Sequence, residues 1–134
     1  MKKHFVPELE RIVDEGAKVK HSEFSDKIDK LFADPAKISP KLSPEHVEAC
    51  YTPIIQSGGS YELKPSTTSN DDELHFGTIL ASLGARYKLY CSNISRTFFI
   101  DPKPEQKANY AILLEAFQKA VAALKPGAKI CDVR

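Results

Sequence analysis

Apolar residues recur with helical spacing in the first part of the chain. Between His4 and Gly16 they fall on one helical face, and Gly16 is a natural C-terminal stop. A second helix is predicted to begin near Ser22, a good N-cap residue, and to end at Asp34-Pro35. The connection from 35 to 46 contains three prolines and is predicted to be ordered but irregular. The pattern therefore predicts two amphipathic N-terminal helices.

The central part of the chain has the chemistry of β-strands. Tyr51 to Ser57 predicts a short strand, and Gly58-Gly59 then predicts a turn rather than a phosphate loop, because no Lys-Ser/Thr follows. The polar run 66–72 predicts a loop. From Phe76 to Pro102 two further segments are apolar, β-branched or aromatic, and they predict an antiparallel hairpin.

The register of this hairpin decides which side chains meet. If the chain turns at Tyr87 and Lys88, opposed residues have numbers that sum to about 175. Ser82 would then face Asn93 across the two strands, with both side chains on one face of the sheet.

A long helix is predicted after the hairpin. Asp101 is its expected cap, Pro126-Gly127 ends it, and its apolar face comprises Tyr110, Leu113, Leu114, Phe117, Val121 and Leu124. Ile130 and Val133 restart an apolar pattern that stops at Arg134, which predicts a domain truncated at its C-terminal side. The predicted class is α/β (α+β), with residues 1–134 as part of one domain.

Composition narrows the class of function. The 134 residues are 42% hydrophobic, which is enough for a real core. The 19 basic and 18 acidic residues nearly cancel, so no charged field favours strong binding to DNA. No apolar run approaches the length of a membrane span, and the N-terminus is a charged helix rather than a signal peptide. We expect a soluble intracellular protein.

Three cysteines, Cys50, Cys91 and Cys131, follow no C-x-x-C spacing. Their odd number argues against a disulfide framework or a structural zinc site, and free thiols suggest a reducing compartment. We expect them to be small buried side chains. Cys91 with His75 as a base would make a nucleophilic pair by residue type, although packing is the commoner role of a strand cysteine.

Carboxylates are absent from the centre of the predicted fold. The 27 residues from Leu74 to Ile100 contain no Asp or Glu, which argues against a metallohydrolase. A local cluster beside this stretch, Asp71, Asp72, Glu73 and His75, is the best remaining metal candidate. Adjacent carboxylates on a loop are more often solvated than bound to a metal.

The order of these elements resembles the first half of the pita-bread fold of methionine aminopeptidase and aminopeptidase P. Two strings, Ile54 to Gly59 and Tyr90 to Thr97, more closely resemble the N-terminal peptidase-like domain of the large subunit of the FACT histone chaperone. The resemblance spans essentially the whole chain, and the second string is highly specific.

The resemblance also marks departures from the active enzymes. Ser82 and Asn93 occupy the positions of two aspartates that clasp two metal ions in active relatives, and the family histidine falls at about Pro65. The remaining family ligands would lie beyond Arg134. Two divalent ions need bridging negative charge, which serine and asparagine do not supply. The resemblance thus implies a degenerate site with no catalytic residue, metal or cofactor.

A histone-binding module is the function that the resemblance implies. It would take part in nucleosome disassembly and reassembly during transcription elongation, replication and repair, in the nucleus on chromatin. Its implied partners are histones H3–H4, the other core histone pair (histones 2A and 2B) through other domains, the second FACT subunit through regions outside this chain, and replication factors. An active metallo-aminopeptidase of the aminopeptidase P type and an architectural docking domain are the alternatives. The sequence does not identify the contact residues.

Overall fold

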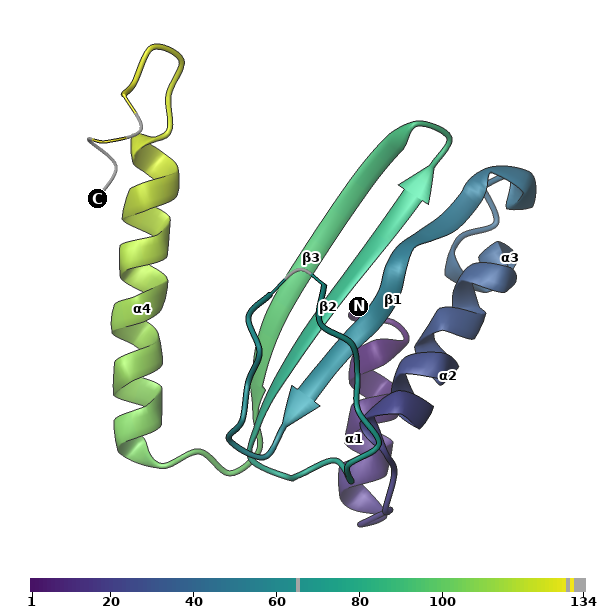
Figure 1. Cartoon of the computed structure of the whole chain (residues 1–134), viewed down its shortest axis with the longest axis horizontal. Helices are drawn as coiled ribbons and strands as arrows, with labels where there is room; N and C mark the ends of the chain where they lie inside the picture. Colours follow the sequence, from purple (N-terminus) through teal and green to yellow (C-terminus); the bar gives the residue numbers. More distant parts are fainter. Residues whose placement is uncertain (65, 130, 132–134) are drawn as a thin grey trace. The chain divides into compact units, whose positions relative to one another are not determined.

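The computed structural model describes residues 1–64, 66–129 and 131. They form two compact units, 1–100 and 101–134. The elements of the first unit, shown in Figure 1, are α1 (Phe5–Asp14), α2 (His21–Ala33), α3 (Pro35–Ile38), a 3-10 turn (Pro44–His46), β1 (Val47–Ser57), β2 (Thr78–Tyr87) and β3 (Tyr90–Phe99). The mixed class and the two predicted N-terminal helices are confirmed.

The boundaries of two elements differ from the predictions. Helix α2 begins at His21 with Lys20 at the N-cap, where the backbone N–H of Lys20 donates to Glu23. Ser22 therefore lies inside the first turn and is not the cap. Strand β1 begins at Val47, four residues before the predicted strand, because it follows β2 along its whole length.

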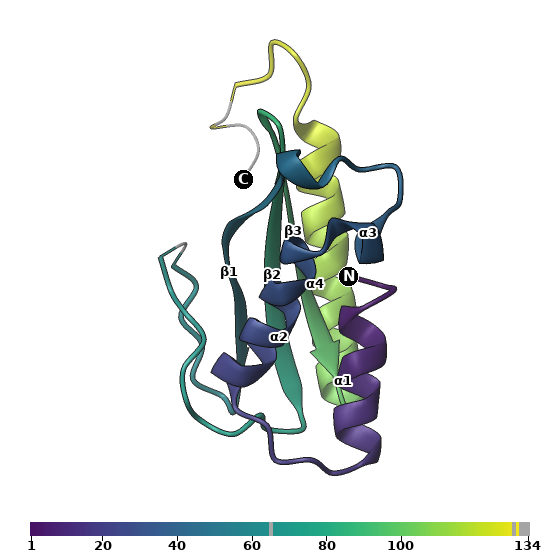
Figure 2. The same cartoon turned by 90° about the vertical axis from the view of Figure 1, so that its right-hand side faces the viewer.

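The core lies between the helices and one face of the sheet. Helix α2 packs against β1 (Figure 1 and Figure 2). The Phe5 ring stacks on Phe24 at a centroid distance of 4.9 Å and on Phe98 at 5.3 Å, which joins α1 to α2 and to β3. The buried apolar residues are Phe5, Leu9, Ile12, Phe24, Ile28, Ile55, Leu74, Ile79, Ala81 and Leu83.

The sheet is antiparallel, in the order β1-β2-β3, and its hairpin corrects the predicted register. The turn is formed by Lys88 and Leu89, one residue later than predicted, with Tyr87 paired to Tyr90. Ser82 therefore pairs with Ser95 and not with Asn93. Moving the turn by one residue shifts each partner by two, so Ser82 and Asn93 still share a face, as predicted.

Alternation along β2 separates a covered face from an open face. Ile79, Ala81 and Leu83 are buried against the helices. Ser82 lies between them in sequence, so its side chain points to the opposite face of the sheet. This open face carries the positions that the family resemblance singled out.

The second unit contains α4 (Pro104–Ala123), which confirms the predicted long helix. Its N-cap is Lys103 rather than Asp101, which lies in the left-handed region at φ 49°. The predicted apolar pattern at Ile130 and Val133 lies outside the described residues. Among the described helices none is long and apolar enough to cross a membrane.

The aromatic stack gives a direct test of the core. We expect Phe5→Ala to lower the free energy of unfolding by about 3–5 kcal/mol, because it removes a ring shared by α1, α2 and β3. Phe76→Ala is the matched control, since Phe76 is 38% exposed and should cost about 1 kcal/mol or less. Denaturant unfolding measures both variants, and similar losses would contradict this core.

Candidate functional site

The open face of the sheet gathers a cluster of neutral polar side chains around Ser82. The Ser82 hydroxyl lies 2.8 Å from the Ser95 hydroxyl on β3 and 2.8 Å from the Tyr51 hydroxyl on β1. The Tyr51 hydroxyl also donates to the amide oxygen of Asn93, which lies 3.5 Å from the Ser82 hydroxyl. Three strands thus contribute to one hydrogen-bonded cluster, Tyr51, Ser82, Asn93 and Ser95, called here the open-face cluster.

A glycine and a β-bulge bring Tyr51 into this cluster. The pairing of β1 with β2 is irregular between Ala49 and Tyr51, and Tyr51 pairs with Gly84. A Cβ on residue 84 would lie 2.5 Å from Cε1 of Tyr51 and 2.9 Å from the Cβ of Cys50. Only glycine leaves room for both side chains, so Gly84 sets the position of the Tyr51 ring.

The open-face cluster carries no formal charge. Its hydrogen bonds join hydroxyl groups and one amide, and the next charged pair along the strands is the ion pair of Glu48 with Arg86. Hydrogen bonding to Glu48 is the main reason that the pKa of Arg86 is raised, so this guanidinium stays charged. A neutral cluster offers hydrogen bonds to a polar ligand but no charge to hold a hard divalent cation.

Two thiols flank the same face, and both are exposed. Cys50 sits in the bulge beside Tyr51, and Cys91 lies on β3 opposite Arg86. The expectation of buried cysteines is wrong, because Cys50, Cys91 and Cys131 are all exposed, although all three are free thiols as predicted. Desolvation raises the pKa of the Cys50 thiol, and hydrogen bonding to Cys91 raises it further.

A second polar arrangement lies at the end of β1, around the buried side chain of His21. The amide nitrogen of Asn70 donates to Asp72, so its oxygen accepts from Nδ1 of His21 at 2.6 Å. Nε2 of His21 then accepts from the Ser57 hydroxyl at 2.7 Å, and Ser57 accepts the backbone N–H of His75. These bonds tie α2, β1 and the following loop together.

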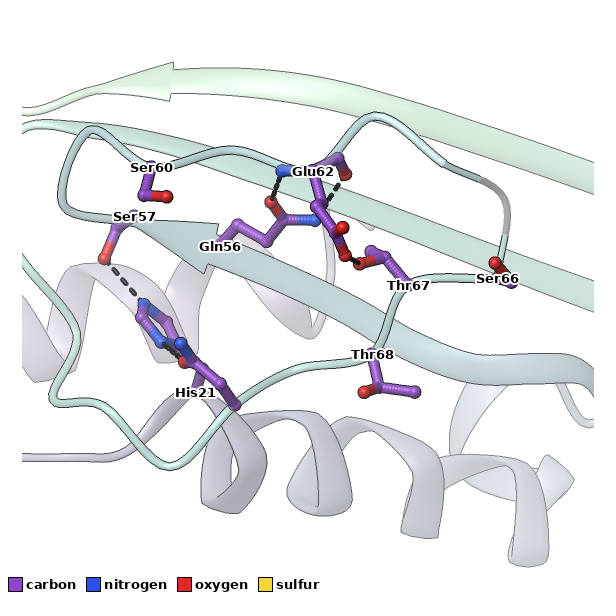
Figure 3. Close-up of a pocket in the computed structure, with 9 residues that line it drawn as sticks. His21, Gln56, Ser57, Ser60, Glu62, Ser66, Thr67 and Thr68 are labelled. Carbon is purple, nitrogen blue, oxygen red and sulfur yellow. Dashed lines mark hydrogen bonds between the residues drawn. The ribbon is translucent and has the colours of Figure 1, made fainter.

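A pocket of about 370 Å³ opens beside His21 (Figure 3). The side-chain amide of Gln56 fixes the backbone of Glu62 in the wall of this pocket. Its nitrogen donates to the Glu62 carbonyl oxygen, and its oxygen accepts from the Glu62 backbone N–H. A hydrogen bond from Thr67 is the main cause that lowers the pKa of Glu62, and one from Lys64 adds to it. The pocket is lined by His21, Gln56, Ser57, Ser60, Glu62, Ser66, Thr67, Thr68 and Asn70.

The pocket places a serine next to a histidine, as in nucleophilic catalysis, but Ser57 is not free to react. It is only 8% exposed, and its oxygen already accepts from the backbone of His75. We therefore assign this arrangement to anchoring the loop and not to catalysis.

The acidic loop residues serve as tethers in the structure. Asp71 accepts from the Ser22 hydroxyl at 2.6 Å, and Glu73 pairs with Lys18 at 3.6 Å. Among the residues that the structure describes, no group of three or more His, Cys, Asp or Glu side chains could hold a metal ion. Pro65, the position that the family histidine would take, lies outside the described residues.

The structure separates the hypothetical nucleophile and base. His75 precedes β2, which begins at Thr78, whereas Cys91 pairs with Arg86 near the other end of that strand. The eight residue-to-residue steps of extended chain from Thr78 to Arg86 span about 26 Å. Cys91 and His75 therefore form no catalytic pair.

Sequence reasoning missed Tyr51 and Ser95 as members of the open-face cluster. Ser95 follows from the register once the turn is placed at Lys88 and Leu89. The position of the Tyr51 ring in the cluster depends on the bulge at Cys50. The one feature of the sequence that indicates this position is Gly84 on the neighbouring strand, which leaves room for the ring.

Comparison with known proteins gives consistent matches. A family model described as metallopeptidase family M24 matches residues 4–134. The chain is 52% identical over 126 residues to the FACT complex subunit SPT16 of Dictyostelium discoideum, covering 94% of this chain and 12% of that protein. It therefore spans about an eighth of the length of this curated relative.

Solved structures agree with these matches. The N-terminal domain of the FACT complex subunit SPT16 from Cicer arietinum (chickpea) has a TM-score of 0.88 and 44% identity, covering 93% of this chain and 30% of that one. The X-Pro aminopeptidase from Thermotoga maritima has a TM-score of 0.62 and 24% identity over 81% of this chain and 29% of that one, a likeness of fold alone. The resemblance to the peptidase-like domain of FACT is confirmed.

Gly84 gives a test of the geometry of this site. We expect Gly84→Ala to lower the free energy of unfolding by about 1–3 kcal/mol, because its Cβ would overlap Tyr51 and Cys50. Gly77→Ala is the matched control, since its Cβ would meet the His75 ring at 3.2 Å and that side chain can move. Thermal or denaturant unfolding compares the two, and equal losses would show that Tyr51 does not pack over Gly84.

Proposed function

Because this chain belongs to the metallopeptidase family M24, we propose that it is a non-catalytic member of that family that binds histones. The observation that carries the proposal is the open-face cluster. Ser82 and Asn93, at the positions of two metal-binding aspartates in active relatives, are hydrogen-bonded to the Tyr51 hydroxyl. The same residues that would hold metal in an enzyme are here neutral and engaged with one another.

Electrostatics supports the loss of peptidase chemistry. Two divalent ions a few Å apart repel strongly and require bridging carboxylates between them. The stretch from Leu74 to Ile100 supplies no Asp or Glu, and Ser82 and Asn93 offer only neutral oxygens. An active aminopeptidase would need other ligands at this face, so the enzyme alternative has less support than a binding module.

The similarity to FACT complex subunits supports a role on chromatin. We propose that the chain binds histones H3–H4 in the nucleus and contributes to nucleosome disassembly and reassembly in transcription elongation, replication and repair. Contacts with histones 2A and 2B and with the second FACT subunit are assigned to other regions of the full protein. The open face suits an extended peptide, because its hydroxyl and amide groups can pair with a peptide backbone.

Residues 1–134 are proposed to be one part of a larger peptidase-like domain. The support is the match to the solved N-terminal domain from chickpea. The matched region covers 93% of this chain but only 30% of that domain. The histone-binding surface of the complete domain would then extend beyond the face formed by β1, β2 and β3.

Docking of replication or chromatin factors is the second candidate function. The tip of the hairpin favours it, because Leu89 is 93% exposed and Tyr90 is 83% exposed. A large aliphatic and an aromatic side chain next to each other are typical anchors of protein interfaces.

Binding measurements at two salt concentrations test the proposal. The complete N-terminal domain should bind H3–H4 with an affinity of about 1 μM or weaker, or about −8 kcal/mol or less favourable, because its balanced charges supply no acidic field. Raising the salt should change this affinity little. Calorimetry or fluorescence titration with histone complexes and tail peptides gives both values.

Two variants separate the candidate surfaces. Asn93→Arg places bulk and positive charge on the open face and should weaken histone binding, whereas Leu89→Ser at the hairpin tip should leave it unchanged. Nanomolar binding that collapses at high salt would rule out the open-face proposal. Loss of histone binding only in Leu89→Ser would move the proposed histone contact from the open face to the hairpin tip. No histone binding at any salt would favour the docking function.

A further inference from the structure

Three Ser-Pro or Thr-Pro dipeptides occur in the chain, and two of them lie close together in the connection between α2 and β1. These two are Ser39-Pro40 and Ser43-Pro44, and the third, Thr52-Pro53, lies inside β1. Proline-directed protein kinases recognise such dipeptides, because they bind the proline ring, which lacks a backbone N–H, directly after the acceptor residue. The sequence thus supplies three acceptors of one type in two structural settings.

The backbone at both serines of the connection is extended. Ser39 has φ −161° and ψ 128°, and Ser43 has φ −73° and ψ 122°. The following proline favours this conformation, since its ring clashes with a preceding residue in the helical region. A kinase holds its acceptor residue in an extended segment, so both serines already have the backbone conformation that phosphorylation requires.

The two prolines of the connection are exposed, whereas the proline in β1 is fully buried. The carbonyl oxygen of Pro53 accepts hydrogen bonds from the hydroxyls of Ser25 and Ser69, which hold it between α2 and the loop before β2. A kinase can therefore reach Pro40 and Pro44 at the surface. It could reach Pro53 only if β1 separated from α2, which packs against it.

The hydrogen bonds around the two serines are local. The Ser39 hydroxyl accepts from the backbone N–H of Lys41 at 3.4 Å, which leaves its own proton available for transfer. Ser43 makes no side-chain capping bond within the described part of the chain. A backbone bond closes the turn after each proline, from Leu42 to Ser39 at 3.2 Å and from His46 to Ser43 at 3.1 Å. Opening these turns for a kinase requires only local unfolding.

We propose that Ser39 and Ser43 are phosphorylation sites for a proline-directed protein kinase, with ATP as the phosphoryl donor. The serine oxygen attacks the γ-phosphorus, the bond from that phosphorus to the bridging oxygen breaks, and ADP leaves with the electron pair. The hydroxyl proton passes to the catalytic aspartate of the kinase. Neither serine belongs to the open-face cluster, so their phosphorylation does not depend on what that cluster binds.

Phosphorylation of these serines would add negative charge close to the hairpin turn. The backbone N–H of Lys88 donates to the carbonyl oxygen of His46 at 2.9 Å, and the His46 ring meets the Tyr87 ring edge-on with centroids 6.3 Å apart. The connection is thus joined to the hairpin turn three residues after Ser43. Each phosphate adds about −1.5 to −2 charges at pH 7, so two would change the net charge of the chain from +1 to about −2 to −3.

Site-resolved phosphorylation tests the assignment. The purified chain, checked for its fold by circular dichroism, is treated with a mitogen-activated protein kinase, ATP and Mg²⁺, and tandem mass spectrometry follows phosphate at each residue. Synthetic peptides that carry the same sites give the rates without the fold. Ser39 and Ser43 should react in the chain within about 10-fold of their rates in the peptides, because only local turns must open. Thr52, the matched control, should react at least about 10-fold more slowly than Ser43 in the chain, since Pro53 is buried.

The variant Pro44→Ala tests whether the proline directs the reaction. It keeps the Ser43 hydroxyl but should lower the rate at Ser43 by about 10-fold or more, because the ring that the kinase binds is lost. Ser39 in the same molecule is the internal control and should keep its rate. Absence of phosphate at both serines, a Thr52 rate equal to that of Ser43, or a Ser43 rate that Pro44→Ala leaves unchanged would each overturn the assignment.

Discussion

The alternation of side chains along β2 is the constraint on which the rest of the structure depends. Ile79, Ala81 and Leu83 point toward α1 and α2, and their burial fixes the pleat of the strand. Because side chains alternate along a strand, Ser82 and Gly84 then lie on the opposite face of the sheet. The covered face provides stability, and the open face is free to carry function.

Gly84 allows the hydrogen-bonded cluster on the open face to form. Its missing side chain lets the Tyr51 ring cross the strand, and the Tyr51 hydroxyl then meets Ser82 and Asn93. The hydroxyl of Tyr51 satisfies hydrogen-bonding groups of both Ser82 and Asn93, and the cluster that results carries no formal charge.

Much of the fold could be predicted from sequence, because its signals are local. The apolar spacing from His4 to Gly16 and the strand chemistry after Phe76 depend only on near neighbours, and both predictions hold. The shared face of Ser82 and Asn93 was also predictable, since a shift of the turn moves partners by two residues and preserves the face.

The site itself was harder to predict, since its contacts are long-range. Tyr51 joins Asn93 across 42 positions of sequence, through a bulge that no local pattern marks. His21 reaches Ser57 across 36 positions in the same way. Cys50 and Cys91 were expected to be buried because cysteine usually is, but residue type cannot reveal which face of a sheet the helices cover.

Paramagnetic Mn²⁺ provides the most direct measurement of whether the open-face cluster excludes the family's metal ions. Mn²⁺ broadens the NMR signals of nuclei close to it, so the side-chain amide of Asn93 and the backbone amides of Ser82 and Ser95 report occupancy of the site. With equimolar Mn²⁺ these signals should not broaden selectively in the parent chain. They should broaden in the double variant Ser82→Asp/Asn93→Asp, which restores two carboxylates and shows that the probe can reach this face. Selective broadening of Asn93 in the parent chain would contradict the neutral, metal-free site.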